Sequence, residues 1–250
     1  MSKTSIVFLG SKPVGYRCLD HLLTQQDALG ATVLAVLTQP RHEFGGEHDL
    51  QSLAAHYHIP VLYSADMLPD CEFLISVQYH RILTSAQLGK ARRAAVNLHM
   101  APLPEYRGSN QFTHAILDGK EEFGTTLHVM DARIDHGPIL AQRRWPVPPG
   151  QWVESLYAQT VEESVVLFEE SLPGLLKGTL ALTPQQDLIP RYGTALHLRK
   201  GMETLKRLDL SWPAEKLERH LRATYMPGFE PPYAMVDGRK VHLIPEALTA

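Results

Sequence analysis

The chain has 250 residues, a formal net charge of −3 and two cysteines. This length suits one large domain, or one domain with a short appended lobe, and is ample for a buried core. The negative charge argues against a dedicated nucleic-acid-binding protein, which would be expected to present a basic face. Cys18 and Cys71 lack the spacing of metal ligands, so we expect buried thiols in a reducing compartment.

The beginning of the chain carries no pattern of a secretory signal or of a membrane-spanning helix. The first apolar stretch, Ser5–Leu9, is short, and no long apolar segment follows a basic start. A spanning helix needs about 20 mostly apolar residues in a row. We therefore expect a cytoplasmic protein with no membrane partner.

The first part of the chain alternates predicted strands with helical segments. A strand at Ile6–Leu9 is followed by apolar residues at helical spacing from Val14 to Leu23, and Thr32–Leu37 is the next strand. This order implies a parallel pair with a right-handed crossover. Three more strands are predicted, at Ile59–Leu62, Phe73–Val77 and Ala94–Leu98. The pattern predicts a doubly wound α/β domain with a mostly parallel, Rossmann-like sheet that binds ligands at the carboxyl ends of its strands.

The loop after the first strand, Gly10–Gly15, only loosely resembles a dinucleotide-binding fingerprint. Pro13 and the missing third glycine argue against a dinucleotide. A phosphate held there by backbone amides, with Lys12 nearby, is the alternative. Further along, Arg41–His48 is polar, contains two glycines and is predicted to be a mobile loop.

The periodicity changes in the second half of the chain. Thr125–Met130 and part of Ile139–Val147 alternate in hydropathy, which predicts strands with one more polar face. A helix should follow from about Trp152 to Ser171, with breaks at Pro173-Gly174 and at Lys177-Gly178.

Beyond Thr183 the chain becomes richer in proline and polar residues, which predicts a small C-terminal lobe. The lobe should contain a helix around Ala214–Ala223 and a β-hairpin that turns at Asp237-Gly238. We therefore divide the chain into a main domain over residues 1–180 and a small lobe over residues 181–250.

An amide, an imidazole and a carboxylate are candidates for chemistry. Asn97 and His99 lie two residues apart at the end of a predicted strand, so their side chains point to the same side. At the carboxyl edge of a parallel sheet, that side opens into the ligand cleft. A histidine two residues after an asparagine is most often structural. The turn at Pro102–Gly108 and the acidic Asp135 in a second tight turn favour a site.

Four motifs together resemble the folate-dependent formyltransferase family. They are Asn-Leu-His, Leu-Pro-x-Tyr-Arg-Gly, Gly-x-Thr-x-His and Asp-x-Gly-x-Ile, which stand here at Asn97–His99, Leu103–Gly108, Gly124–His128 and Asp135–Ile139. Tyr79–Leu83 resembles the loop of the family's folate pocket. The similarity spans roughly Ser5 to Leu172, so the resemblance implies that residues 1–180 form the catalytic domain.

The resemblance implies 10-formyltetrahydrofolate as the formyl donor and a primary amine as the acceptor. Attack of the amine on the formyl carbon creates an oxyanion, which the Asn97 amide would stabilise. His99 would take the proton from the attacking nitrogen and return one to the departing folate nitrogen. Asp135 would pair with His99, fix its orientation and raise its basicity. No metal is needed, and His128 would either support these groups or be a structural histidine.

For the folate, the resemblance implies contacts with the pterin ring from two loops. The backbone around Arg81–Leu83 and the carbonyls of Asp131 and Ala132 would supply them. Core packing is the alternative for the two apolar residues of the first loop. The full set of expected folate contacts is Gln78, Arg81, Ile82, Leu83, Asp131 and Ala132.

Departures from the family pattern bear on the acceptor. The transfer-RNA enzymes have a Ser-Leu-Leu-Pro run and a basic loop, where this chain has Met100–Pro104 and the mixed loop Arg41–Glu47. Too few residues remain for the nucleic-acid-binding domain of those enzymes, so with the negative charge we expect no nucleic-acid partner. Ser11–Pro13 does not match the glycine-rich phosphate loop of the purine-pathway enzyme.

Ser109–Phe112 and Arg222–Tyr233 look like segments of the nucleotide-sugar N-formyltransferases. Those enzymes formylate an amino-dideoxyhexose linked to a nucleotide diphosphate, for bacterial surface polysaccharide such as the lipopolysaccharide O-antigen. Amide groups suit sugar hydroxyls, a cation would meet the diphosphate, and an aromatic ring would stack on the base. The expected substrate contacts are Lys12, Arg107, Asn110, Gln111 and Tyr225. Arg107 could equally lock a turn, and Tyr225 could pack the lobe or a dimer interface.

Several alternatives stay open on the sequence. The acceptor could be methionyl-tRNA or glycinamide ribonucleotide, or the same three groups could deliver water, as in a formyltetrahydrofolate deformylase. A non-catalytic nucleotide- or folate-binding module is a different class again. The nucleotide (dTDP, UDP or GDP) and the sugar are left undetermined. The apolar, proline-rich C-terminal segment predicts a homodimer surface.

Overall fold

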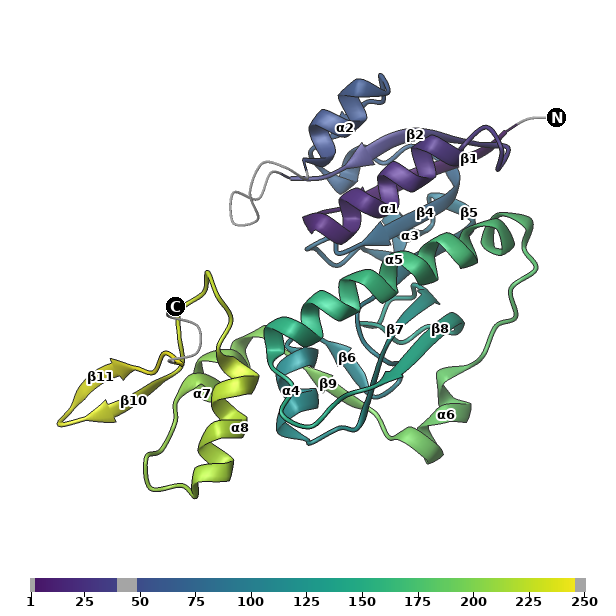
Figure 1. Ribbon diagram of the computed structural model, residues 1–250. Coiled ribbons are helices and arrows are strands. Elements are labelled where there is room, and N and C mark those ends of the chain that lie inside the picture. The colour runs from purple at the N-terminus through teal and green to yellow at the C-terminus, as the bar shows by residue number, and fades with distance from the viewer. Residues whose placement is uncertain (1–2, 40–48, 246–250) are drawn as a thin grey trace.

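The computed structural model describes residues 3–39 and 49–245, so the predicted loop at Arg41–His48 lies outside the described residues. At its centre is a seven-stranded sheet in the order β3-β2-β1-β4-β5-β7-β8 (Figure 1). The first five strands run parallel, whereas β7 is antiparallel to β5 and β8 to β7. The predicted α/β class with a mostly parallel sheet is confirmed. The strands are β1 Thr4–Gly10, β2 Ala31–Leu37, β3 Val61–Leu62, β4 Cys71–Val77, β5 Ala91–His99, β7 Glu122–Val129 and β8 Ile139–Pro146.

Two long helices, α1 Lys12–Gln25 and α5 Val153–Lys177, cross the same face of the sheet next to each other (Figure 1). Pro13 lies in the first turn of α1, and the apolar residues predicted at helical spacing are at most 2% exposed. They join α5 and the sheet in one core cluster. A second cluster lies on the opposite face, beside α3 Ser85–Leu88. Cys18 and Cys71 are buried, one in each cluster, as predicted.

The helix α5 passes the first of its two predicted breaks and ends at the second. It continues through Pro173 to Lys177 and ends at Gly178, which has a left-handed φ of 73°. An interior proline costs a helix about 3 kcal/mol. Leu175 and Leu176 are only 4% and 5% exposed, and burying a leucine is worth roughly 1.5–3 kcal/mol. Burial of these two side chains therefore offsets the proline. The predicted break at Pro173-Gly174 is wrong, whereas the predicted break at Lys177-Gly178 is confirmed.

The strand β7 is buried on both faces, so the predicted polar face of this strand is also wrong. Thr125 and Thr126 are both 0% exposed. The Thr125 hydroxyl lies 2.7 Å from the Ser164 hydroxyl on α5, and the Thr126 hydroxyl donates to the Ala101 carbonyl at 2.8 Å. A buried hydroxyl is tolerated when it is hydrogen-bonded. The threonines therefore face α5 and the loop after β5, not solvent.

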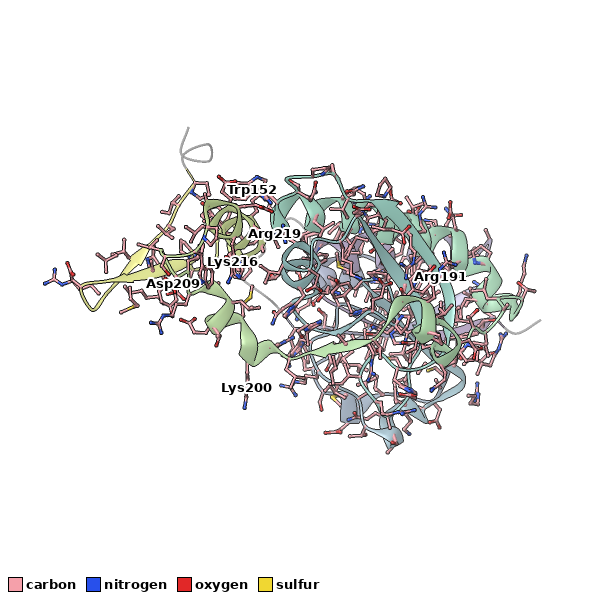
Figure 2. All side chains as sticks on the ribbon, turned by 90° about the horizontal axis from the view of Figure 1, so that it is seen from below. Trp152, Arg191, Lys200, Asp209, Lys216 and Arg219 are labelled. Atoms are coloured by element: carbon pink, nitrogen blue, oxygen red, sulfur yellow. The ribbon has the colours of Figure 1, made fainter. Side chains whose placement is uncertain are left out.

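The C-terminal part folds in two stages. The chain after α5 first crosses the main body as α6 Gln185–Tyr192 and β9 Ala195–His197, which pairs in parallel with β6 Tyr106–Gly108. It then forms α7 Met202–Lys206, α8 Ala214–Thr224 and the hairpin β10 Tyr233–Val236 and β11 Arg239–His242. Figure 2 shows this path from Arg191, beside the body, through Lys200 to Asp209 and the projecting hairpin. Residues 181–197 thus contact the main body, and the domain boundary at residue 180 stays a prediction.

The hairpin turns at Asp237 and Gly238, as predicted, and both have positive φ angles of 48° and 75°. Two positive φ values match the twist of a two-residue hairpin. The shorter helices α2 Leu50–His56 and α4 Gln111–Leu117 complete the fold. No helix in the described ranges is long and apolar enough to cross a lipid bilayer.

Candidate active site

The candidate groups meet at the carboxyl edge of the sheet. Asn97 and His99 end β5, with their side chains on one side of the strand. Because β7 runs antiparallel to β5, His128 stands directly opposite Asn97. Asp135 follows in the turn between β7 and β8, and its carboxylate contacts both imidazoles. The amide, imidazole and carboxylate of the sequence hypothesis are therefore neighbours.

The tautomer of His99 follows from its surroundings. Its Nε2 lies 2.7 Å from the carbonyl oxygen of Tyr106. A carbonyl only accepts hydrogen bonds, so Nε2 carries the hydrogen and donates it. The other nitrogen, Nδ1, faces Asp135 Oδ2 at 3.6 Å. The Tyr106 carbonyl thus fixes the ring, and in neutral His99 the Nδ1 lone pair is free to accept a proton.

The carboxylate of Asp135 has several close polar neighbours. Its Oδ2 accepts a hydrogen bond from the Gly108 N–H at 2.9 Å. Its Oδ1 lies 3.4 Å from His128 Nε2 and 3.5 Å from Asn97 Nδ2. The residue has a left-handed φ of 46°, a conformation that costs a non-glycine residue roughly 1 kcal/mol. Its neighbours must therefore stabilise the turn that presents the carboxylate.

His128 orients the amide of Asn97. Its Nδ1 lies 2.9 Å from the Val129 carbonyl, so Nδ1 carries a hydrogen. In the neutral ring Nε2 is then an acceptor, and it lies 3.3 Å from Asn97 Nδ2. The side chain is 2% exposed. His128 therefore sits behind the candidate groups and restrains the Asn97 amide.

The environment of Asp135 keeps it ionised. Burial alone would raise the pKa of its carboxyl, but the imidazoles of His99 and His128 and the Gly108 N–H outweigh burial. The pKa of Asp135 is therefore held well below its usual range. The charge that faces His99 Nδ1 persists throughout the neutral pH range.

The lowered pKa of Asp135 predicts acid sensitivity. A carboxyl with a lower pKa in the folded than in the unfolded chain adds stability above its unfolded pKa, about 3.9. This stability is lost as the pH falls towards the folded value. We expect the free energy of unfolding to decrease below about pH 5, and to decrease less in Asp135→Asn. Urea unfolding across a pH series measures this, and an equal decrease in both proteins would contradict it.

Two glycines let the turns of the site approach other backbone segments. A Cβ on Gly137 would lie 2.0 Å from the Val129 carbonyl oxygen. A Cβ on Gly108, whose φ is +88°, would lie 2.2 Å from the carbonyl oxygen of His197. Neither position accommodates a side chain without a shift of the backbone.

We expect Gly137→Ala to lower the free energy of unfolding by about 1–3 kcal/mol, because the added methyl group overlaps a backbone atom. The matched control is Gly201→Ala, since no atom lies within 4 Å of a Cβ there. The control should stay within about 0.5 kcal/mol of the wild type. Equal unfolding midpoints for the two variants would contradict the close approach at Gly137.

A cavity of about 840 Å³ opens next to these groups. Asn97, His99, His128 and Asp135 line one wall. Its rim includes residues 197–199 and Phe229 from the C-terminal part. Among the described residues, no group of three or more histidine, cysteine or acidic side chains is arranged to hold a metal ion.

Comparison with known proteins assigns the family. Residues 63–172 match the formyl transferase family. A methionyl-tRNA formyltransferase from Pelobacter propionicus is 30% identical over 237 residues, which cover 89% of this chain and 72% of the relative. The chain belongs to the formyl transferase family. The methionyl-tRNA formyltransferase of Myxococcus xanthus is 32% identical over 246 residues, which cover 91% of this chain and 75% of the relative.

Solved structures share the fold of this formyl transferase. An N-formyltransferase from Helicobacter canadensis, in complex with folinic acid and dTDP-3-aminofucose, gives a TM-score of 0.78 at 19% identity and covers 95% of this chain and 86% of that one. A 4-N formyltransferase from Francisella tularensis gives a TM-score of 0.75 at 17% identity and covers 97% and 98%. At these identities the likeness supports the fold.

Most residues expected to contact folate line the cavity of the formyl transferase. Gln78, Arg81, Ile82, Leu83 and Asp131 do so, whereas Ala132 does not. Ile82 is 73% exposed, while Leu83 is 7% exposed and belongs to a core cluster. Of the two apolar residues in this loop, core packing therefore explains Leu83 but not Ile82.

The residues expected to bind the acceptor divide into two groups. Lys12, Asn110 and Gln111 line the cavity, whereas Arg107 and Tyr225 do not. Arg107 donates from Nε to the Ile134 carbonyl at 3.0 Å, which locks the turn before Asp135. Tyr225 caps the C-terminal end of α8.

Lys12 lies at the point where the strand order reverses, between β1 and β4. Lys12 directly follows the loop after β1, and its Nζ donates a hydrogen bond to Gln78 Oε1 at 3.1 Å. Both residues have positive φ angles, of 67° and 57°. Ligands of open α/β sheets bind at such switch points.

One part of this cavity comes from residues that were not expected to bind a ligand. His197, Leu198, Arg199 and Phe229 line it although they come from the predicted lobe. The parallel pairing of β9 with β6 brings the first of them there. The side chain of Asn110 also donates to the Leu198 carbonyl at 3.1 Å. A pairing of two three-residue strands has too little periodicity to be found in a sequence.

Proposed function

We propose that this formyl transferase moves the formyl group of 10-formyltetrahydrofolate to the amino group of a nucleotide-linked amino-dideoxy sugar, for surface polysaccharide synthesis. The observation that carries the proposal is the meeting of His99, Asn97 and Asp135 on one wall of a single large cavity. In this proposal His99, Asn97 and Asp135 are the catalytic residues.

The proposed reaction uses the free nitrogen of His99. The acceptor amine attacks the formyl carbon, a new carbon–nitrogen bond forms, and the carbonyl oxygen becomes an oxyanion. The Asn97 amide donates a hydrogen bond to that oxyanion. His99 Nδ1 takes the proton from the amine and passes one to N10 of the folate as the old bond breaks. Asp135, 3.6 Å from Nδ1, stabilises the transient imidazolium.

The proposed donor site lies beside Ile82. An exposed apolar side chain at a cavity rim suits an aromatic ring, and Met130 and Leu88 line the same cavity. The carbonyls and amides of the two neighbouring loops would pair with the pterin. Gln78, Arg81 and Asp131 are the polar residues proposed for this contact, and Leu83 supports the loop from the core.

Charge supports an anionic acceptor. The cavity is lined by four basic side chains, Lys12, Arg81, Arg133 and Arg199, against the two acidic side chains of Asp131 and Asp135. The chain as a whole has a net charge of −3. A basic cavity in an acidic protein attracts small anions such as a folate tail or a diphosphate. Asn110 and Gln111 are the proposed contacts with sugar hydroxyls, and Lys12 the proposed contact with the diphosphate.

Methionyl-tRNA is the second candidate acceptor, because the sequence relatives described above carry that name. The two acceptors are distinguished by comparing kcat/KM for dTDP- and UDP-linked amino sugars with kcat/KM for methionyl-tRNA, at a fixed concentration of 10-formyltetrahydrofolate. We expect a nucleotide sugar to be preferred by at least about 100-fold, which corresponds to roughly 2.7 kcal/mol. Preference for methionyl-tRNA would overturn the proposed acceptor, and formate release without any acceptor would indicate a deformylase.

A homodimer is part of the proposal. The hairpin β10–β11 exposes Met235, Val236 and Val241 by 41–44%. Such apolar side chains on a projecting hairpin suit an interface between identical subunits. Light scattering should give twice the mass of the chain, and Val241→Asp should shift it towards the monomer. A monomeric wild type would contradict this part of the proposal.

A further inference from the structure

Gln185, the first residue of α6, contacts the turn that carries Asp135. Its Nε2 donates to the Asp135 carbonyl at 3.0 Å and to the Gly137 carbonyl at 2.8 Å. The residue is 5% exposed. Both partners are carbonyl oxygens, so only the NH2 end of the amide can face them. Gln185 therefore supplies two donors to a turn about 50 residues earlier in the chain.

The two accepting carbonyls belong to the strained residue itself and to Gly137, two residues later. Asp135 has a left-handed φ, and Gly137 sits against Val129 with no room for a Cβ. The backbones of Thr183 and Ile139 exchange two hydrogen bonds of 2.8 Å, which anchor the segment just before Gln185. The geometry of the turn, and with it the direction of the Asp135 carboxylate, thus depends on donors from α6.

The segment that contains Gln185, residues 183–197, also supports His99. After α6 the chain forms β9, which pairs with β6. The strand β6 supplies the Tyr106 carbonyl that orients His99 and the Gly108 N–H that binds Asp135. Residues 183–197 therefore support Asp135 directly, and support His99 through β6.

We propose that Gln185 is a positioning residue, which holds the Asp135 turn so that the carboxylate faces His99 Nδ1. This inference rests on the proposed function for its link to catalysis, but not on the identity of the acceptor. Gln185 contacts the backbone of the turn and does not line the cavity. Its loss should lower the rate of the chemical step and leave substrate binding almost unchanged.

The first experiment compares Gln185→Leu and Gln185→Met with the wild type. Methionine is close to glutamine in length and has neither amide donors nor a charge, so it serves if the leucine variant does not fold. We expect kcat to fall about 10- to 100-fold, because a small misplacement of a catalytic group has effects of this size. The KM values for folate and acceptor should stay within about twofold. The matched control is Gln186→Leu at the neighbouring exposed residue, which should match the wild type.

A kcat within twofold of the wild type in a folded Gln185 variant would overturn the inference. So would a raised KM with unchanged kcat, since that would mean a role in binding. A second readout needs no turnover and remains available if no formyl transfer is found. In carbon-13 NMR, the Asp135 carboxyl should begin to titrate at higher pH in Gln185→Met, which adds no charge, than in the wild type or Gln186→Leu. An identical titration in all three proteins would overturn the positioning role, independently of the proposed function.

Discussion

Replacing His99 with glutamine should reduce kcat about 10²- to 10⁴-fold, the usual range for loss of a general base. The glutamine NH2 can still donate to the Tyr106 carbonyl, as His99 Nε2 does at 2.7 Å. It cannot accept a proton at the position of Nδ1. The variant therefore keeps the hydrogen bond that fixes the side chain and loses only the proton transfer. Steady-state kinetics with saturating folate and acceptor measure the effect.

The matched control for this variant is His56→Gln, at an exposed histidine on α2 far along the chain from the site. It should keep the activity of the wild type. Full activity of His99→Gln would exclude His99 as the proton carrier. Because glutamine is close to histidine in size, its unfolding midpoint should stay near that of the wild type, and this separates loss of chemistry from loss of fold.

Replacing Asp135 with asparagine should lower kcat by about two to three orders of magnitude. The amide oxygen can still accept the Gly108 N–H, which lies 2.9 Å from Asp135 Oδ2. The negative charge 3.6 Å from His99 Nδ1 is lost. The imidazolium that the proposed proton transfer forms would then have no counter-charge in a buried site, where an ion pair is stronger than in water. The pH–rate profile should change in shape as well as in height.

Asp187→Asn is the matched control, because Asp187 is an exposed carboxylate in the first turn of α6. It should leave both kcat and the pH–rate profile unchanged. If Asp135→Asn shows only a raised KM, Asp135 acts in binding, and its proposed role beside His99 is wrong.

The fold was largely predictable because its strongest signals are local. Apolar runs gave the five parallel strands, and helical spacing gave α1, since each of these elements buries residues that repeat with a fixed period. The wrong predictions concern positions whose structure depends on contacts with residues far away in the sequence. Thr125 looks polar in the sequence but is buried under Ser164, and Pro173 looks like a helix end but lies beside buried leucines.

The site was predictable in its centre and not at its edges. Asn97, His99 and Asp135 could be chosen because their motifs bring specific residue types to the ends of strands. Arg107 carried the same kind of motif signal, yet its guanidinium binds the Ile134 carbonyl outside the cavity. Gln185 and the residues of β9 reach the site by long-range pairing, which has no local pattern.

The most direct test of formyl transfer at this site follows the formyl carbon itself. The wild type is incubated with 10-formyltetrahydrofolate carrying carbon-13 in the formyl group, together with a nucleotide-linked amino sugar, and the products are observed by NMR. We predict that the label appears in an amide on the sugar nitrogen, in proportion to the tetrahydrofolate formed, and that His99→Gln slows the appearance of this signal at least about 100-fold. Label found only in formate, or an equal amide signal from His99→Gln, would contradict formyl transfer by His99, Asn97 and Asp135.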